Sequence, residues 1–277
     1  MKRQPILLLT VIVLTMLAAS CKKVASLIDP ADANALTSVL VIPGSSKTSG
    51  NPPAPTGTPS SPALVLNQST LSTNAGAQFI VPFTYTSNSG YSTCYVQVDG
   101  ATNGFFTVPN SGAAGSPNSG TIAVPITIPS NVLNGSFCIT YCIADRDGNI
   151  SNVMTTCVTI KEQLDCSTAT ASGSEGLTFT NVNMGNTAGD VDINYDTYSV
   201  PDRIDVYQGT TWLTGTGANP GSPIPPLSDC SSPLPGFIGA SGTLSVSYNP
   251  SNGKVLTVVV SGCMGGGTAW DWSMTCP

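Results

Sequence analysis

The spacing of apolar side chains constrains the fold of this chain more than any other feature. In residues 79–85, 122–128 and 137–143, large apolar residues recur at every second position. A period of two is typical of β-strands that bury one face, and the Gly-, Asn-, Ser- and Pro-rich stretches between these segments indicate turns. The sequence therefore predicts an all-β fold.

Two tandem β-sandwich domains fit this pattern and the length of the chain. About seven strands over residues 63–162 suit an immunoglobulin-like sandwich. Residues 137–152 resemble the last hairpin of bacterial immunoglobulin- or fibronectin-III-like modules, with a tight turn at Asp147 and Gly148. Residues 163–277 form the second predicted sandwich, with strands expected at 177–182, 190–195, 203–208, 243–248, 255–260 and 268–275.

The N-terminus resembles that of a bacterial lipoprotein. Lys2 and Arg3 precede an apolar run over residues 6–17, which is too short to span a bilayer. Residues 18–21, Ala-Ala-Ser-Cys, resemble a lipobox. The resemblance implies that residues 1–20 are a signal peptide and that Cys21 carries a diacylglyceryl group and an acylated amine, with palmitate as a typical chain. An ordinary secretory signal with an incidental Cys21 is the alternative.

Residues 21–62 are predicted to be a lipidated, flexible linker. From residue 43 to residue 62, 17 of 20 residues are Pro, Gly, Ser or Thr, a composition that cannot bury a core. Lys22 stands where an inner-membrane lipoprotein of proteobacteria would usually have Asp. We therefore expect export to the outer membrane or cell surface.

Eight cysteines follow Cys21, four on each side of residues 161–163, and an even number in an exported chain indicates disulfides. Zinc is disfavoured because the chain has no histidine and no Cys-x-x-Cys pair. Around a turn at 147–148, the numbers of two opposed residues add up to 295, as those of Cys138 and Cys157 do. In an immunoglobulin-like sheet, the strands that carry Cys94 and Cys142 are neighbours. The predicted bonds are Cys138–Cys157, Cys94–Cys142, Cys166–Cys276 and Cys230–Cys263.

A second resemblance concerns residues 189–209 and 267–277. They look like a module of secreted bacterial proteins and are loosely similar to CUB domains, so the second sandwich is expected to be CUB-like or jelly-roll-like. The CUB resemblance implies a calcium site at Asp196, Asp202 and Asp205. The alternative is a solvated strand face, with Arg203 in a cross-strand ion pair with Asp196.

The tryptophans offer a further candidate site. Trp270, Trp272 and Met274 share one strand face, which favours a place in the core. Trp212 lies between Gly209 and Gly215 and is the ring expected to be exposed for stacking on a ligand.

Composition narrows the function. Only 9% of residues are charged and the net charge is −6, which argues against binding to nucleic acid or anionic lipid head groups. Without histidine, a Ser-His-Asp triad is impossible, and no enzyme activity is expected. No cofactor is required, and Ca²⁺ is the one ion with candidate ligands. We expect a membrane-anchored, surface-exposed binding or adhesion module for a glycan or protein. The alternatives are a structural lipoprotein of an outer-membrane assembly and a carbohydrate-binding accessory to a degradative enzyme.

Overall fold

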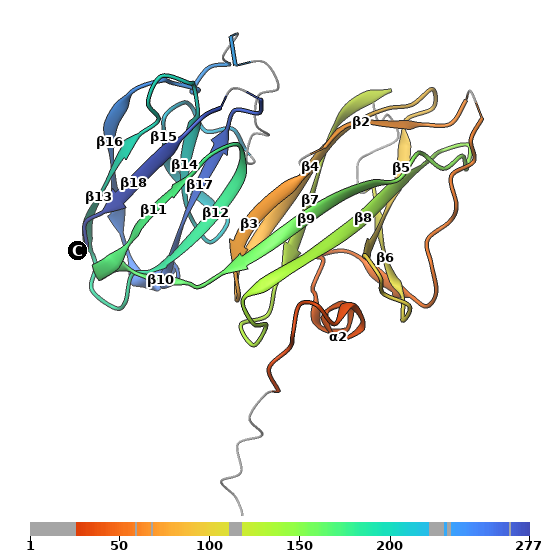
Figure 1. Cartoon of the computed structure of the whole chain (residues 1–277), viewed down its shortest axis with the longest axis horizontal. Coiled ribbons are helices and arrows are strands. Elements are labelled where there is room, and N and C mark those ends of the chain that lie inside the picture. The colour runs from red at the N-terminus through yellow and green to blue at the C-terminus, as the bar shows by residue number, and fades with distance from the viewer. Residues whose placement is uncertain are drawn as a thin grey trace, which may run out of the picture.

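The computed structural model describes residues 26–58, 60–67, 69–110, 118–221, 230–231, 234–265 and 267–277. The predicted signal peptide and Cys21 lie outside these residues. The described part is built almost entirely of strands, as the sequence predicts, and forms two β-sandwiches that lie side by side (Figure 1). No helix in the described ranges is long and apolar enough to cross a membrane.

The first sandwich consists of a three-stranded sheet that faces part of a longer sheet. The three-stranded sheet has the order β2 (Ala63–Asn67), β4 (Gln78–Thr86) and β7 (Ser119–Thr127). The facing strands follow the order β1 (Ser46–Thr48), β6 (Phe105–Pro109), β5 (Tyr91–Val98), β8 (Gly135–Asp145), β9 (Met154–Lys161) and β3 (Thr70–Asn74). This order is consistent with the predicted immunoglobulin-like fold.

The alternating residues of these strands form the core of the first sandwich. Phe79, Val81 and Phe83 of β4 are buried, and so are Ile139 and Tyr141 of β8. The rings of Phe83 and Tyr141 stack with their centroids 4.5 Å apart, which joins the two sheets at the centre of the core. The period-two pattern in the sequence therefore identified the inward face of both strands.

The second sandwich also has two sheets. One has the order β11 (Thr170–Gly173), β18 (Trp270–Met274), β13 (Gly189–Asp196) and β16 (Ser241–Tyr248). The other has the order β12 (Gly176–Asn183), β17 (Val255–Gly262), β14 (Arg203–Gln208) and β15 (Thr211–Gly215), with β10 (Leu164–Asp165) beside β12. All six strands expected here are present, and Trp270 and Trp272 are buried in the core as predicted.

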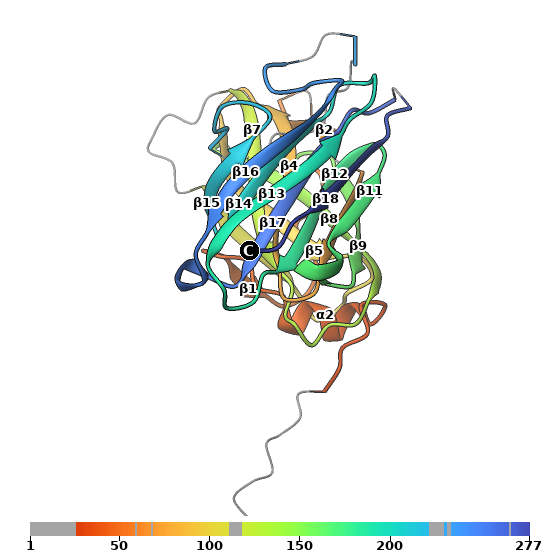
Figure 2. The same cartoon turned by 90° about the vertical axis from the view of Figure 1, so that its left-hand side faces the viewer.

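A single strand, β3, joins the two sandwiches into one continuous sheet. It pairs in parallel with β9 of the first sandwich and with β12 of the second. The two smaller sheets cover opposite faces of this long sheet, since Val258 and Val260 pack in the second core while Val259 packs with the first. Figure 2 shows the four-stranded sheet in front of β12, β17 and β14.

Asn74 fixes the joint between the sandwiches. Its side-chain amide donates hydrogen bonds to the carbonyl oxygens of Lys161, at 3.1 Å, and Glu162. Its Oδ1 accepts a hydrogen bond from the backbone N–H of Asn181, at 2.8 Å. The side chain is buried, so one amide connects the last strand of the first sandwich, the connecting segment and β12.

The prediction of a flexible linker over residues 21–62 is wrong for the described residues 26–58, which are wrapped along the first sandwich. A short helix, α2 (Ala33–Val39), is capped by Asp32 and lies against the first sandwich (Figure 1). Leu36, Leu40 and Ile42 are buried in the first core. The Pro- and Ser-rich part of this segment is held against the sandwich without apolar side chains, because β1 pairs with β6 through main-chain hydrogen bonds. We call residues 26–58 the strap.

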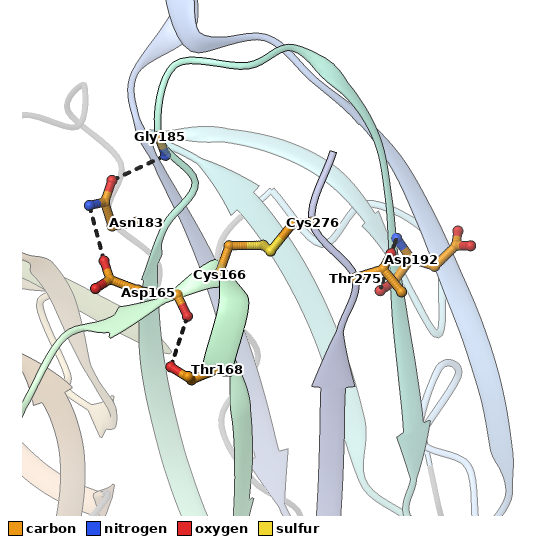
Figure 3. The surroundings of a disulfide bond; sticks show 8 residues. All are labelled: Asp165, Cys166, Thr168, Asn183, Gly185, Asp192, Thr275 and Cys276. Atoms are coloured by element: carbon orange, nitrogen blue, oxygen red, sulfur yellow. Dashed lines mark hydrogen bonds between the residues drawn. A yellow bond between two sulfur atoms is a disulfide. The ribbon is translucent and has the colours of Figure 1, made fainter.

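Three of the four predicted disulfides are present: Cys138–Cys157, Cys166–Cys276 and Cys230–Cys263. Figure 3 shows the bond between Cys166 and Cys276, which joins the two ends of the second sandwich. Nearby, Asn183 donates to the carboxylate of Asp165 at 3.2 Å, which ties β12 to β10.

The predicted Cys94–Cys142 bond is wrong, and both thiols are unpaired and buried. In the register of β5 and β8, Cys94 lies opposite Ile143 and Tyr95 lies opposite Cys142. The two thiols therefore belong to opposite faces of the sheet, Cys94 in the main core and Cys142 in a small outer cluster.

The hairpin between β8 and β9 also differs from its prediction. Cys138 and Cys157 are opposed, as the predicted register requires. The turn, however, is wider than two residues, because the carboxylate of Asp145 accepts hydrogen bonds from the N–H groups of Asp147 and Asn149. Asp145 therefore closes the loop. The pairing keeps the predicted register from Gly135–Ile160 to Tyr141–Met154 and shifts by one residue only at the bridge between Ala144 and Ile150.

Candidate functional site

A cavity of about 640 Å³ lies where the first sandwich meets the outer face of the second. This volume falls within the range of roughly 300–1,000 Å³ that is usual for small-molecule sites. The first sandwich contributes the turn between β3 and β4 and the start of β4, with Ala75, Gly76, Ala77, Gln78 and Ile80, and also Thr127 and Ser130. The second sandwich contributes Phe179, Asn181, Tyr207, Val255, Thr257 and Val259, from β12, β14 and β17.

The continuous sheet explains why these residues can form a cavity. In β12, β14 and β17, every second side chain points into the second core, and the others point to the opposite face. On an isolated sandwich that opposite face would be in water. Here Phe179, Tyr207 and Val259 are buried because the first core extends over them.

The cavity combines apolar surface with uncharged polar groups. Phe179 and Tyr207 contribute rings, while Gln78, Gln163 and Asn181 contribute amides. Hydroxyls come from Thr127, Ser130, Thr210 and Thr257. Among the described residues that line the cavity there is no Asp, Glu, Lys, Arg or Cys. A ligand in this site would therefore meet no opposite charge.

Two buried polar groups of the cavity wall have no hydrogen-bond partner. They are Nδ2 of Asn181 and the hydroxyl of Tyr207, on side chains that are 3% and 8% exposed. The other amide atom of Asn181 is used, since its Oδ1 accepts a hydrogen bond from Thr257 at 2.6 Å. Leaving a buried polar group unpaired costs about 1–3 kcal/mol, so such groups in a native structure call for an explanation.

The environment of Tyr207 keeps its hydroxyl protonated. Burial raises the pKa of Tyr207 above its ordinary value, and the nearby carboxylate of Asp205 raises this pKa further, while Arg203 opposes the shift. The hydroxyl is therefore available as a hydrogen-bond donor at any physiological pH.

A buried ion pair supports the face of β14 beside the cavity. Arg203 donates through Nε and Nη2 to the two carboxylate oxygens of Asp205, at 2.7 and 2.8 Å. The predicted ion pair with Asp196 is wrong, because β14 pairs with β15 and β17 and not with β13. Both side chains of the observed pair are almost fully buried.

Trp212 is part of this support and is not a free stacking platform. Its Nε1 donates to Oδ1 of Asp205 at 2.9 Å, and its half-buried ring packs against the first core. The prediction of an exposed ring was therefore wrong. The cause is β15, a strand that was not predicted and that places Trp212 opposite Tyr207.

The three carboxylates proposed as calcium ligands have separate roles. Asp196 accepts a hydrogen bond from the N–H of Tyr198 at 2.7 Å, and Asp205 is held by Arg203. Asp202 is fully buried and accepts hydrogen bonds from the N–H of Cys263, at 2.8 Å, and the hydroxyl of Thr268, at 2.6 Å. Within the described ranges no group of three acidic, cysteine or histidine side chains could hold a metal ion.

Sequence reasoning missed Asn181 and Tyr207 as site residues. Both lie in strands that were predicted correctly, on the face that a separate second sandwich would expose to water. One signal was present in β17, where three consecutive valines, residues 258–260, indicate a strand buried on both faces.

Comparisons with known proteins place the chain in no family. No family model and no curated protein matches it, whereas 49 chains of solved structures do. A mutant of the SrpA adhesin from Streptococcus sanguinis is 19% identical, over 37% of this chain and 58% of its own, with a TM-score of 0.26. The GspB Siglec domain is 15% identical, over 43% of this chain and 64% of its own, with a TM-score of 0.30. The chain thus spans less than two thirds of either structure. At such low TM-scores the neighbours do not indicate a function, which has to be inferred from the cavity.

Proposed function

We propose that this protein is an exported, non-catalytic binding module that holds its ligand in the cavity between the two sandwiches. The single observation that carries this proposal is the pair of unpartnered groups, Nδ2 of Asn181 and the hydroxyl of Tyr207, in the wall of a cavity of ligand size. A ligand that hydrogen-bonds to them would compensate for their burial.

The chemistry of the cavity supports binding and not catalysis. General acid–base or nucleophilic catalysis needs a group that changes protonation or attacks the substrate. The described lining residues contain no carboxylate, amine or thiol, and the raised pKa of Tyr207 keeps its hydroxyl protonated, so no phenolate is available as a base. The described part of the lining can therefore recognise a molecule but offers no group suited to transforming it.

A lipid anchor at Cys21 belongs to the same proposal. The apolar run of residues 6–17 and the Ala-Ala-Ser-Cys sequence support it. Two or more acyl chains would hold the module stably at a membrane surface. Metabolic labelling with a palmitate analogue tests this directly, because labelling of the chain should be lost in Cys21→Ser.

The binding function can be tested by closing the cavity. Thr210 lines the cavity and is exposed, so Thr210→Trp should narrow the entrance without disturbing a core. Thr211→Trp is the matched control, since Thr211 is also exposed but does not line the cavity. The full chain in detergent would be screened against arrays of glycans, peptides and lipids. We expect a ligand whose binding is lost in Thr210→Trp and kept in Thr211→Trp. Retention of all binding in Thr210→Trp would place the site elsewhere and refute the proposal.

A further inference from the structure

We infer that the ligand of the cavity is a neutral saccharide. This inference rests on the proposed binding function and adds the chemical class of the ligand. It follows from the chemistry of the groups that line the cavity. It also follows from the pairing of the wall strands, which leaves no open strand edge among the described residues of the wall.

A charged ligand does not fit the lining. Burying an ion without a counter-charge is strongly unfavourable. Arg203 and Asp205 lie close to Tyr207 on the same strand, but neither lines the cavity. Their charges neutralise each other in a bidentate ion pair. The cavity therefore selects against carboxylated, phosphorylated and amino-bearing ligands.

A wholly apolar ligand, such as an acyl chain, does not fit either. It would fill the space but leave Nδ2 of Asn181 and the hydroxyl of Tyr207 unpaired at the cavity wall. Unpaired groups of this kind discriminate strongly against ligands that cannot hydrogen-bond.

An extended peptide is disfavoured because the cavity presents no open strand edge. Peptides commonly bind by adding a strand to such an edge. The wall strands β12, β14 and β17 each have a partner on both sides. At the edge of β7, Thr127 exchanges two main-chain hydrogen bonds with Val41 of the strap, at 2.8 and 3.2 Å. The strap thus occupies the one edge that reaches the cavity among the described residues.

A neutral saccharide satisfies all of these conditions. Its ring carries an apolar face, which can pack on Phe179, Tyr207 and Val259, and a rim of hydroxyls, which can bond to the unpaired amide and phenol. Uncharged amides and hydroxyls around aromatic rings are groups that pair with sugar hydroxyls without any ionic contact.

Matched sugars test the inference by isothermal titration with the full chain. Methyl glucoside, N-acetylglucosamine and their disaccharides are the neutral probes, and glucuronic acid and glucosamine are the charged counterparts of the same ring. We expect the best neutral probe to bind at least about 10-fold more tightly than its charged counterpart, because burial penalises the charge. Equal affinity for neutral and charged members would overturn the inference.

Tyr207→Phe provides the residue-level test. It removes only a hydroxyl that has no partner in the protein, so the melting temperature should stay constant or rise. Sugar affinity should fall about 3- to 10-fold, the effect of one neutral hydrogen bond. Tyr195→Phe is the control, because Tyr195 is on β13 and does not line the cavity. Unchanged affinity in Tyr207→Phe would remove this residue from the site and refute the hydrogen-bonding argument.

The outcomes also separate the ligand class from the binding function. If peptides or lipids bind in a manner that Thr210→Trp blocks, and no sugar does, the saccharide inference fails while the binding function stands. If sugars bind equally well to Thr210→Trp, both the inference and the location of the site fail.

Discussion

Replacing Arg203 with methionine removes one half of a buried ion pair and tests how the second sandwich is held together. The guanidinium pairs with Asp205 and also donates to the carbonyl oxygens of Ala218, at 2.7 Å, and Pro235, at 3.2 Å. Both carbonyls belong to the connection between β15 and β16, near its start and near its end. A Cβ at either Gly217 or Gly236 would collide with the guanidinium, so the connection can approach it at these two points only through glycine.

The cost of this substitution can be estimated from the burial of the pair. Arg203 and Asp205 are 2% and 1% exposed. Removing one partner of such a pair costs roughly 3–5 kcal/mol, because a buried charge remains uncompensated. At about 2–4 °C per kcal/mol for a cooperative unit of 150–250 residues, the melting temperature of the two joined sandwiches should fall by roughly 6–20 °C.

A double-mutant cycle measures the pair itself. Arg203→Met, Asp205→Leu and the double variant would be unfolded in urea at neutral pH and followed by tryptophan fluorescence. We expect the double variant to be more stable than Arg203→Met alone, since it buries no lone carboxylate. Arg146→Met is the control: Arg146 is exposed, and its loss should change stability by no more than about 0.5 kcal/mol.

Two results would refute this reasoning. One is a loss of less than about 1 kcal/mol in Arg203→Met, which would mean that the carboxylate of Asp205 finds water or another partner. The other is strict additivity in the cycle, which would show that the two side chains contribute independently.

Three further predictions concern other buried polar groups. Burial raises the pKa of Asp202 to about 6, so the native state holds this proton more tightly than the unfolded chain. Ionisation of Asp202 should therefore lower the free energy of unfolding by up to roughly 3 kcal/mol as the pH rises from 4 to 7. In Asp202→Asn, the free energy of unfolding in urea should vary less over this pH range. The same pH dependence in the variant and the unchanged protein would contradict this. Burial raises the pKa of Cys142 to about 11 and also raises the pKa of Cys94. Maleimide should therefore label both thiols only after denaturation, and a Cys94–Cys142 disulfide peptide in mass spectrometry would disprove the assigned faces. Asn74→Ala should destabilise the joint by about 2–4 kcal/mol through its lost buried hydrogen bonds and split thermal unfolding into two transitions, whereas a single unshifted transition would show that the joint does not depend on this side chain.

The sequence predicted the strands well because each strand pattern is local. The alternation around Val81 and the two buried tryptophans of β18 depend on one strand and one core, which a period of two reveals directly. The register through Cys138 and Cys157 was likewise set by one short hairpin.

The cavity could not be predicted in the same way, because it depends on how the two sandwiches meet. No local pattern shows that β3 pairs with both β9 and β12, or that Phe179 is covered by the other sandwich. The Cys94–Cys142 prediction failed for a related reason. Proximity of two strands says nothing about the face of each cysteine until the register is known.

The strap was missed because composition was weighed over individual side chains. Leu36, Leu40 and Ile42 are few among many small residues, yet each is buried. The remaining contacts are made by the backbone, including the hydrogen bond from the N–H of Thr56 to the carbonyl of Ile150, at 3.1 Å. Main-chain pairing of this kind leaves almost no trace in the sequence.

The strap also changes the geometry that a lipid anchor would impose. Contact with the first sandwich begins at Ser26, whose carbonyl oxygen accepts a hydrogen bond from the side-chain amide of Asn131 at 2.9 Å, and continues at Ile28, whose backbone bonds to Asn131 and Leu133. Four residues lie between Cys21 and Ser26, and five Cα–Cα steps reach at most about 18 Å. An acylated Cys21 would therefore hold the first sandwich close to the lipid head groups and restrict its tumbling. The flexible linker predicted over residues 21–62 would have allowed both a larger distance and free rotation. The cavity would then meet its ligand at or near the membrane surface.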